Sequence, residues 1–250
     1  TALGYNSLEA NTTTNHHTAV GFQALGSNTS GTNNTAVGSQ ALDANTTGYS
    51  NVAIGHDAMG AATTGDRCVA VGSYALDAAL TGNDNTAIGN EAGSAVTSGA
   101  NNTALGSYSL RFCTTASDNT ALGKSAATNT VGANNTAVGS IALSNNTTGS
   151  ANTAVGKDAL AANTTANSNT AVGTDALTAN TTGAQNTAIG HDALGGNQTA
   201  SYNTAVGYAS LDANTTGAEN TALGNQALGA NTTGAYGIAI GSGALQNNTT

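Results

Sequence analysis

Residues 34–48 read N-T-A-V-G-S-Q-A-L-D-A-N-T-T-G, and variants of this stretch fill all 250 residues. The tripeptide Ala-aliphatic-Gly recurs in one column fifteen times, and the glycines of that column are 17 residues apart except for one step of 16 between Gly123 and Gly139. The residue two before the glycine is Ala in every copy, and the next is always Val, Ile or Leu. Invariant small and aliphatic columns beside variable polar ones are typical of stacked, equivalent coils. The sequence therefore predicts a single repeat domain over residues 1–250.

The period and the apolar pattern favour strands over helices. Seventeen residues are too few for two helices and their turns, and the apolar residues lack a sustained i, i+3, i+4, i+7 pattern. Short runs such as Thr35-Ala36-Val37, bounded by Asn and Gly, are typical of strands between turns. We therefore predict an all-β fold, a parallel β-solenoid (β-roll) of about fifteen 17-residue coils stacked ~4.8 Å apart.

Two columns supply the large aliphatic side chains. The Val37-type column stands directly before the repeat glycine, and the Leu42-type column stands four residues after it. Alanine fills the other invariant apolar positions. We expect both aliphatic columns to point inward and to form a thin core, with the variable positions outside.

The composition argues against several classes of function. Only 7% of the residues are charged, and four basic against thirteen acidic side chains give a net charge of −9. We expect no nucleic-acid partner, because phosphate binding needs clustered Lys and Arg. No apolar run approaches the ~20 residues of a membrane span, so we expect no membrane insertion. Nucleophile-elbow, phosphate-loop and dinucleotide motifs are absent from the sequence, so we predict a protein that is not an enzyme and needs no cofactor.

An asparagine column directly precedes the strand at eleven of fourteen coil junctions. Amides stacked in equivalent coils can hydrogen-bond along the axis, as in other cross-β ladders. We therefore predict a structural ladder here, which includes Asn34, Asn51, Asn85, Asn119, Asn152, Asn186 and Asn220.

The motif N-x-T, or N-x-S at Asn28, recurs in one segment of ten coils. Its asparagines are Asn11, Asn28, Asn45, Asn146, Asn163, Asn180, Asn197, Asn214, Asn231 and Asn248. An exposed N-x-T is an acceptor for N-glycosylation in a secreted protein, so this column predicts a solvent-exposed ridge that can carry covalent N-glycans. The alternative is that a turn repeat rich in Asn and Thr generates the motif without modification.

Acidic residues also share a column. Asp158, Asp175 and Asp192 occupy the same position in three consecutive coils, so we expect their carboxylates in a row ~5 Å apart. A calcium ion would suit such oxygen ligands, which makes the row a candidate metal site. We favour a solvated acidic face without a metal, because the glycine-aspartate nonapeptide of calcium-binding β-rolls is absent from the sequence. No set of His, Cys and carboxylates has zinc-ligand spacing.

Cys68 and Cys113 are the two cysteines, and they stand in different columns. Their axial offset of ~13 Å exceeds the Cα separation of roughly 4.4–6.8 Å that a disulfide needs. We therefore predict that they do not pair within the chain.

Residues 34–42, N-T-A-V-G-S-Q-A-L, and residues 186–194, N-T-A-I-G-H-D-A-L, resemble the head repeats of YadA-type trimeric autotransporter adhesins. They are still more similar to the N-T-A-[VI]-G…N-T-T-G arrays of phage tail-fibre-like and bacterial surface proteins. The resemblance covers all 250 residues. It implies a β-roll that is left-handed in the adhesin family, a place outside the cell or on the cell or virion surface, and a chain that is often a homotrimer.

The leading functional hypothesis is a non-enzymatic extracellular structural fibre, which N-glycans could coat. Both ends of the sequence fall inside a repeat, so we expect a segment of a longer array, or copies that stack end to end into a filament. One alternative is a trimeric adhesin or tail-fibre-like shaft that binds cell-surface glycans or receptors. The other is an ice-binding solenoid, because threonine-bearing solenoid faces can order water. Thr46 and Thr47 are adjacent and should point to opposite faces, so a regular two-column threonine face is not predicted.

Overall fold

The structure, a computed structural model, describes residues 1–12 and 14–250 as an all-β parallel solenoid, which confirms the predicted fold class. The chain forms two compact units, Thr1–Ser125 and Ala126–Thr250. The single domain and the left-handed sense stay predictions. Within the described residues, no helix is long and apolar enough to cross a membrane.

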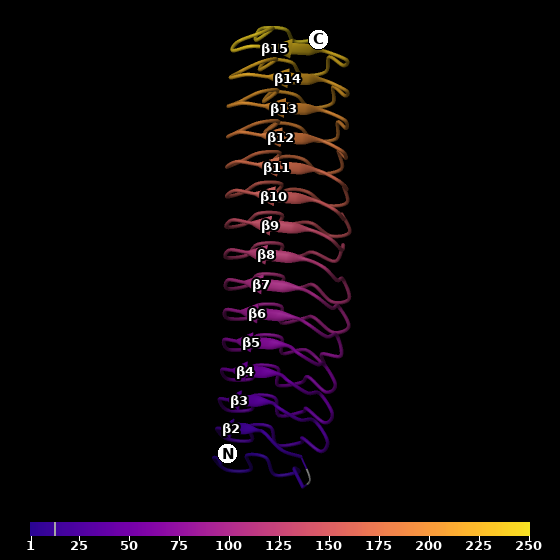
Figure 1. The fold of residues 1–250 in the computed structure, drawn as a ribbon. Helices are drawn as coiled ribbons and strands as arrows, with labels where there is room; N and C mark the ends of the chain where they lie inside the picture. Colours follow the sequence, from indigo (N-terminus) through magenta and orange to yellow (C-terminus); the bar gives the residue numbers. More distant parts are fainter. Residues whose placement is uncertain (13) are drawn as a thin grey trace. The chain divides into compact units, whose positions relative to one another are not determined.

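Each coil contributes one short strand, and within each unit the strands stack one above another (Figure 1). The strands of the first unit are β1 (Ala2–Leu3), β2 (Thr18–Val20), β3 (Thr35–Val37), β4 (Val52–Ile54), β5 (Val69–Val71), β6 (Thr86–Ile88), β7 (Thr103–Leu105) and β8 (Thr120–Leu122). Those of the second unit are β9 (Thr136–Val138), β10 (Thr153–Val155), β11 (Thr170–Val172), β12 (Thr187–Ile189), β13 (Thr204–Val206), β14 (Thr221–Leu223) and β15 (Ile238–Ile240).

Pairing between neighbouring strands is parallel and in register with the repeat. Thr153 pairs with Thr170, and Ala154 with Ala171, so each residue lies beside the one 17 positions later. Every column of the sequence is therefore a row of identical environments along the axis. This register brings equivalent side chains together and makes ladders possible.

The Val37-type column points outward, so our prediction that it forms part of the core is wrong. Each strand alternates with Thr and the aliphatic residue outside and Ala inside, as in Thr187, Ala188 and Ile189. Ala188 is fully buried, whereas Ile189 is 41% exposed. The invariant alanines therefore face the interior, and the aliphatic column faces outward.

The Leu42-type column does form the core, with the backbone in an uncommon conformation. Leu42, Leu160 and Leu177 are fully buried, and each has a φ of 52°. This left-handed region costs a non-glycine residue on the order of 1–3 kcal/mol. Burial of the leucine side chain contributes roughly 1.5–3 kcal/mol and offsets that strain.

The repeat glycine allows the coils to stack closely. Gly190 has a φ of +137°, and a Cβ there would lie 2.4 Å from the carbonyl oxygen of Gly207 in the next coil. No other residue type fits this conformation and this approach. The invariance of the column therefore follows from the spacing between coils.

Candidate functional site

The first asparagine column, directly before each strand, joins successive coils. The backbone N–H of Asn51 donates to Oδ1 of Asn34 (2.9 Å), and Nδ2 of Asn34 donates to the carbonyl of Gly48 in its own coil (2.7 Å). In the second unit, the N–H of Asn186 donates to Oδ1 of Asn169 at 2.9 Å. The column is buried at all the positions that we assigned to it: Asn34, Asn51, Asn85, Asn119, Asn152, Asn186 and Asn220. Each side chain thus closes its own coil and holds the next.

The N-x-T asparagines form a second buried ladder, which the sequence analysis missed. Nδ2 of Asn180 donates to Oδ1 of Asn163 (3.1 Å) and to the carbonyl of Gly183 (2.9 Å). Oδ1 of Asn180 in turn accepts from Nδ2 of Asn197 at 2.9 Å. The buried members are Asn28, Asn45, Asn146, Asn163, Asn180, Asn197, Asn214 and Asn231. A clear signal was available, because ten asparagines in one column is also what a structural ladder requires.

The solvent-exposed sugar ridge that we expected is therefore wrong at these eight positions. A glycan on Nδ2 would replace a donor of the ladder and would need space that the interior does not have. Asn248 is exposed and Asn11 is half-buried, so these two remain the accessible candidates. The threonine of the Asn11 motif, Thr13, lies outside the described residues.

The second ladder is interrupted where the sequence departs from the repeat. Among the described residues, three buried side-chain oxygens lack a hydrogen-bond partner: Oδ1 of Asn45, Oδ1 of Asn231 and Oγ1 of Thr130. Asn45 is followed one coil later by Ala62, which offers no amide donor. Thr130 itself stands in the ladder column. The ends of the ladder therefore leave buried acceptors unpaired.

The acidic row is not a set of three bare carboxylates. Lys157 pairs with Asp158, and Nδ1 of His191 lies 2.8 Å from Oδ2 of Asp192. Ligand atoms of Asp175, His191 and Asp192 lie within 4.8 Å of one another, which brings together two members of the predicted row and one histidine. His191 is exposed and the two carboxylates are half-buried, so the group lies at the surface, where clustered acidic side chains are common without an ion. We therefore assign no metal to it.

The cysteine thiols are buried in the two ladder columns. Cys68 replaces an asparagine of the first column and Cys113 one of the second, and among the described residues both are free. Burial raises the pKa of each thiol to about 11, so both stay protonated and unreactive near neutral pH.

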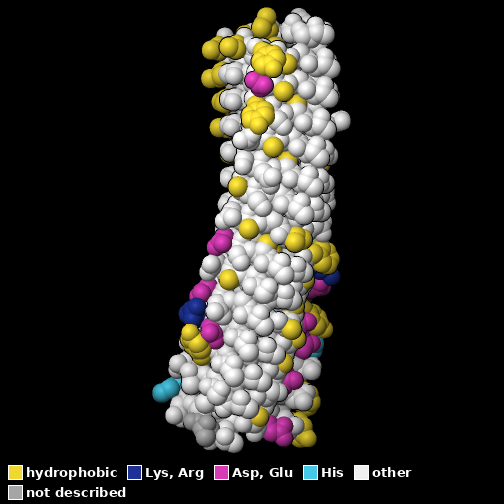
Figure 2. Space-filling view, turned by 90° about the vertical axis from the view of Figure 1, so that its right-hand side faces the viewer, with side chains coloured by type: hydrophobic (Ala, Val, Ile, Leu, Met, Phe, Trp, Pro, Cys, Tyr) yellow, Lys and Arg dark blue, Asp and Glu magenta, His cyan; other side chains and the backbone are white. Residues whose placement is uncertain are grey.

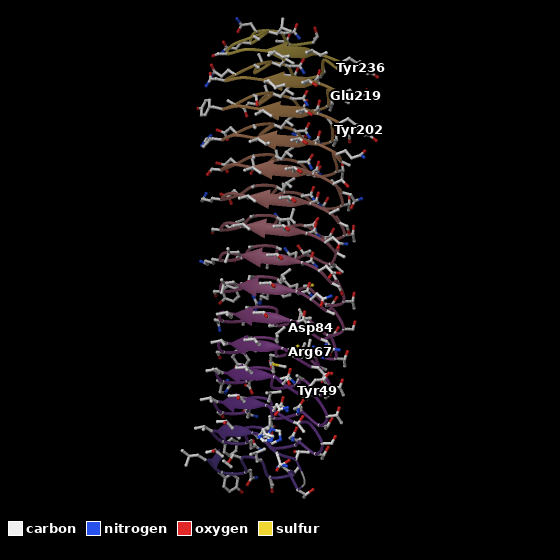
Figure 3. All side chains as sticks on the ribbon, viewed as in Figure 1. Tyr49, Arg67, Asp84, Tyr202, Glu219 and Tyr236 are labelled. Atoms are coloured by element: carbon white, nitrogen blue, oxygen red, sulfur yellow. The ribbon has the colours of Figure 1, made fainter. Side chains whose placement is uncertain are left out.

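Charged and aromatic residues lie on the outer columns. Arg67 donates through Nε and Nη2 to Asp84 (2.7 and 2.8 Å) and through Nη1 to the hydroxyl of Tyr49 at 2.7 Å (Figure 3). In the second unit, Tyr202, Glu219 and Tyr236 occupy the column of Arg67 and project from the edge of their coils (Figure 3).

Another outer cluster lies around Arg111. The guanidinium of Arg111 lies 5.0 Å from the ring centroids of both Tyr108 and Phe112, and it pairs with Glu91. Figure 2 shows one face that consists mostly of backbone and of side chains that are neither hydrophobic nor charged, with charged groups in small separate patches.

The outward strand positions form a further surface that the sequence analysis did not identify. We call the outward threonines and aliphatic residues of β9–β14 the strand face. Its threonines are Thr136, Thr153, Thr170, Thr187, Thr204 and Thr221, and its aliphatic residues are Val138, Val155, Val172, Ile189, Val206 and Leu223. The signal was the T-A-V alternation itself, which places two columns on one side of a strand.

Comparison with known proteins gives no relative from which a function could be transferred. No family model matches the sequence, and no curated protein matches it significantly.

Proposed function

We propose that the protein is a non-enzymatic structural fibre module that acts outside the cell. The observation that carries this proposal is the continuity of its axial contacts within each unit. A parallel sheet and an asparagine ladder connect each coil to the next, as from Asn152 to Asn169 and on to Asn186. Contacts of this kind add with every coil, so length is gained without a larger core.

The surface chemistry fits the same proposal. A chain with 7% charged residues and no proline depends on hydrogen-bonded ladders for order rather than on ion pairs. Because eight asparagines of the second ladder column are buried, that column can carry glycans only at Asn11 and Asn248. The column therefore cannot supply a continuous ridge of glycans.

Immunogold electron microscopy on the source cells or virions tests the proposal. Antibodies raised against the purified protein should label filaments on intact, unpermeabilised material. Preincubation of the antibodies with the protein should abolish the labelling, which provides the control. Gold particles confined to the cell interior, or surface label without filaments, would contradict the proposal.

A second candidate is a trimeric adhesin or tail-fibre-like shaft, which the outer cluster around Arg111 favours. Phe112 is 48% exposed beside a cation and a carboxylate, a combination suited to a protein or glycan receptor. The equivalent positions in the coil of Gly173 are Thr178 and Ala179. An Arg111→Thr, Phe112→Ala double variant therefore restores the pattern of the repeat without disturbing the coil.

Adhesion and mass measurements test this second candidate. The adhesin hypothesis predicts that the wild type binds host cells, that the double variant loses this binding, and that the wild type sediments at three times its chain mass of 24.0 kDa. Binding by the double variant equal to the wild type, or a monomer that still binds, would contradict it.

A further inference from the structure

The strand face combines two rows of different chemistry at a fixed spacing. On each strand from β9 to β14, a threonine and an aliphatic side chain point outward two residues apart, which is roughly 6.6 Å. The same two columns repeat on the next strand in exact register, as Thr170 beside Thr187 and Val172 beside Ile189. None of these outward positions carries a charge. The result is a neutral array of two parallel rows that repeats along the solenoid axis.

The threonine hydroxyls of this face are available to solvent. In the part of the chain that the structure describes, none of the strand-face threonines donates its hydroxyl to a protein acceptor. The threonines of the N-T-T segment differ: Thr164 donates to the carbonyl of Thr181 (3.0 Å), and Thr181 to that of Gln198 (3.0 Å). The strand-face hydroxyls therefore have their hydrogen-bonding capacity free, whereas those of the N-T-T column are already engaged.

The backbone beneath the face is held firmly. Ala154, Ala171 and Ala188, which alternate with the outward residues, are fully buried. Both asparagine ladders continue through the same coils, so the rows cannot shift relative to one another without breaking buried hydrogen bonds. A surface fixed in this way loses little conformational entropy when it meets a rigid partner.

We propose that the strand face is an ice-binding surface. Ice is an uncharged lattice with a regular repeat, so it matches a surface that is neutral and periodic along the solenoid axis. The aliphatic side chains and threonine methyl groups favour ordered water over the apolar rows, and the free hydroxyls can join that water by hydrogen bonds. Each contact is weak, but all of them act together because the rows are in register. The proposal goes beyond the proposed fibre function and does not depend on it.

The array suits a lattice better than a dissolved small molecule. Small-ligand sites are concave and use a few convergent polar groups. The cavities lined by Tyr74, Asp77 and Glu91, and by Asp212 and Gln226, lie over other columns. A second copy of the chain could also cover the strand face, and that occupant is tested below.

Thermal hysteresis of the purified protein is the measurement. Thr170→Tyr places a bulky ring in the middle of the face, and Thr170→Lys places a hydrated charge there. Ser168→Tyr is the matched control in the same coil, because tyrosine already stands in that column at Tyr202 and Tyr236. Circular dichroism melts confirm that each variant is folded, and sedimentation velocity gives the mass.

We expect hysteresis for the wild type and for Ser168→Tyr, and a several-fold reduction for both Thr170 variants. A wild type without hysteresis at millimolar concentration would overturn the proposal, and so would a folded Thr170 variant equal to the wild type. An oligomer that Thr170→Lys converts to a monomer would also overturn it, because the face would then belong to self-association. None of these outcomes bears on whether the chain forms surface filaments.

Discussion

Thr130 carries a hydroxyl in a place where the fold supplies no partner. It is fully buried, its Oγ1 lacks a hydrogen bond among the described residues, and it occupies the second asparagine column. Thr130→Val keeps the branched shape and removes the unpaired group. We expect the variant to be more stable by about 1 kcal/mol in urea unfolding, because a buried polar group without a partner is destabilising.

Thr164→Val is the matched control for that substitution. The Thr164 hydroxyl donates to the carbonyl of Thr181 at 3.0 Å, so its removal should lower stability by about 1 kcal/mol. If Thr130→Val and Thr164→Val change stability in the same direction, the assignment of an unpaired hydroxyl at Thr130 is wrong.

The carboxylate of Asp212 gives a prediction about pH. Burial raises the pKa of Asp212 above its ordinary value of 3.8, and the Asp192 carboxylate adds to the shift. The folded state therefore holds this proton more tightly than the unfolded state, and stability falls as the pH rises through the folded pKa. Asp212→Asn should be more stable than the wild type at neutral pH, and the difference should vanish in acid. Urea unfolding at a series of pH values measures it.

Asp84 is the control, because its pKa is shifted in the opposite direction. The guanidinium of Arg67 lowers the pKa of Asp84, so its contribution is present above the unfolded pKa and is lost as the pH falls. Asp84→Asn should be slightly less stable than the wild type at neutral pH and equal to it in acid. The same slope for both variants would contradict this account.

At the scale of the element, the second asparagine ladder should contribute more to the free energy of unfolding than the sum of its individual hydrogen bonds. Asn180 makes two donor bonds and accepts a third, so Asn180→Ala leaves Oδ1 of Asn163 and Nδ2 of Asn197 each without one partner in a dry interior. We expect a loss of roughly 2–4 kcal/mol in chemical denaturation. The exposed neighbour Thr182, changed to Ala, should alter stability little. A loss below about 0.5 kcal/mol for Asn180→Ala would mean that water replaces the amide.

The repeat glycine gives a second element-scale prediction. Gly190→Ala forces a Cβ into a left-handed backbone position, 2.4 Å from the carbonyl oxygen of Gly207. We expect destabilisation of roughly 3 kcal/mol or more, from strain and overlap together. Gly229→Ala is the control, because Ala161 stands in the same column and the nearest atom to the new Cβ is 3.2 Å away. Thermal melts that do not separate the two variants would contradict the close-stacking argument.

The strands show what sequence reasoning could reach and where it stopped. The 17-residue period and the run Thr35-Ala36-Val37 predicted β3 with its observed bounds. The facing of Val37 was predicted wrongly, although its column accepts Val, Ile and Leu alike, a tolerance that a close-packed interior does not have. The positive φ of Leu42 could not be predicted, because residue preference argues against it and only packing explains it.

The candidate surfaces were also predicted only in part. Periodicity located both asparagine columns, but it could not tell a buried amide from an exposed sequon, because the two use the same residues. The adjacent threonines Thr46 and Thr47 argue against a regular threonine face, whereas the strand threonine Thr35 alternates with Val37 on one side of its strand. Periodicity predicts which residues share a column, but it does not predict whether the side chains of that column point inward or outward.

At the scale of the whole molecule, stability should depend on the number of coils and not on which coil is present. Deletion of residues 169–185 removes one full period inside the second unit and joins Ser168 to Asn186. Asn152 then lies beside Asn186, Asn163 beside Asn197, and β10 beside β12, so both ladders and the sheet can re-form. Because stability in a repeat protein is a sum of coil and interface contributions, we expect a cooperative melt at a slightly lower temperature.

Deletion of residues 169–177, which removes half a coil, takes away a strand and a buried leucine and should abolish that transition. Circular dichroism melts of both variants provide the comparison, and unfolding of the full-period deletion to the same extent as the half-period deletion would show that the coils are not interchangeable.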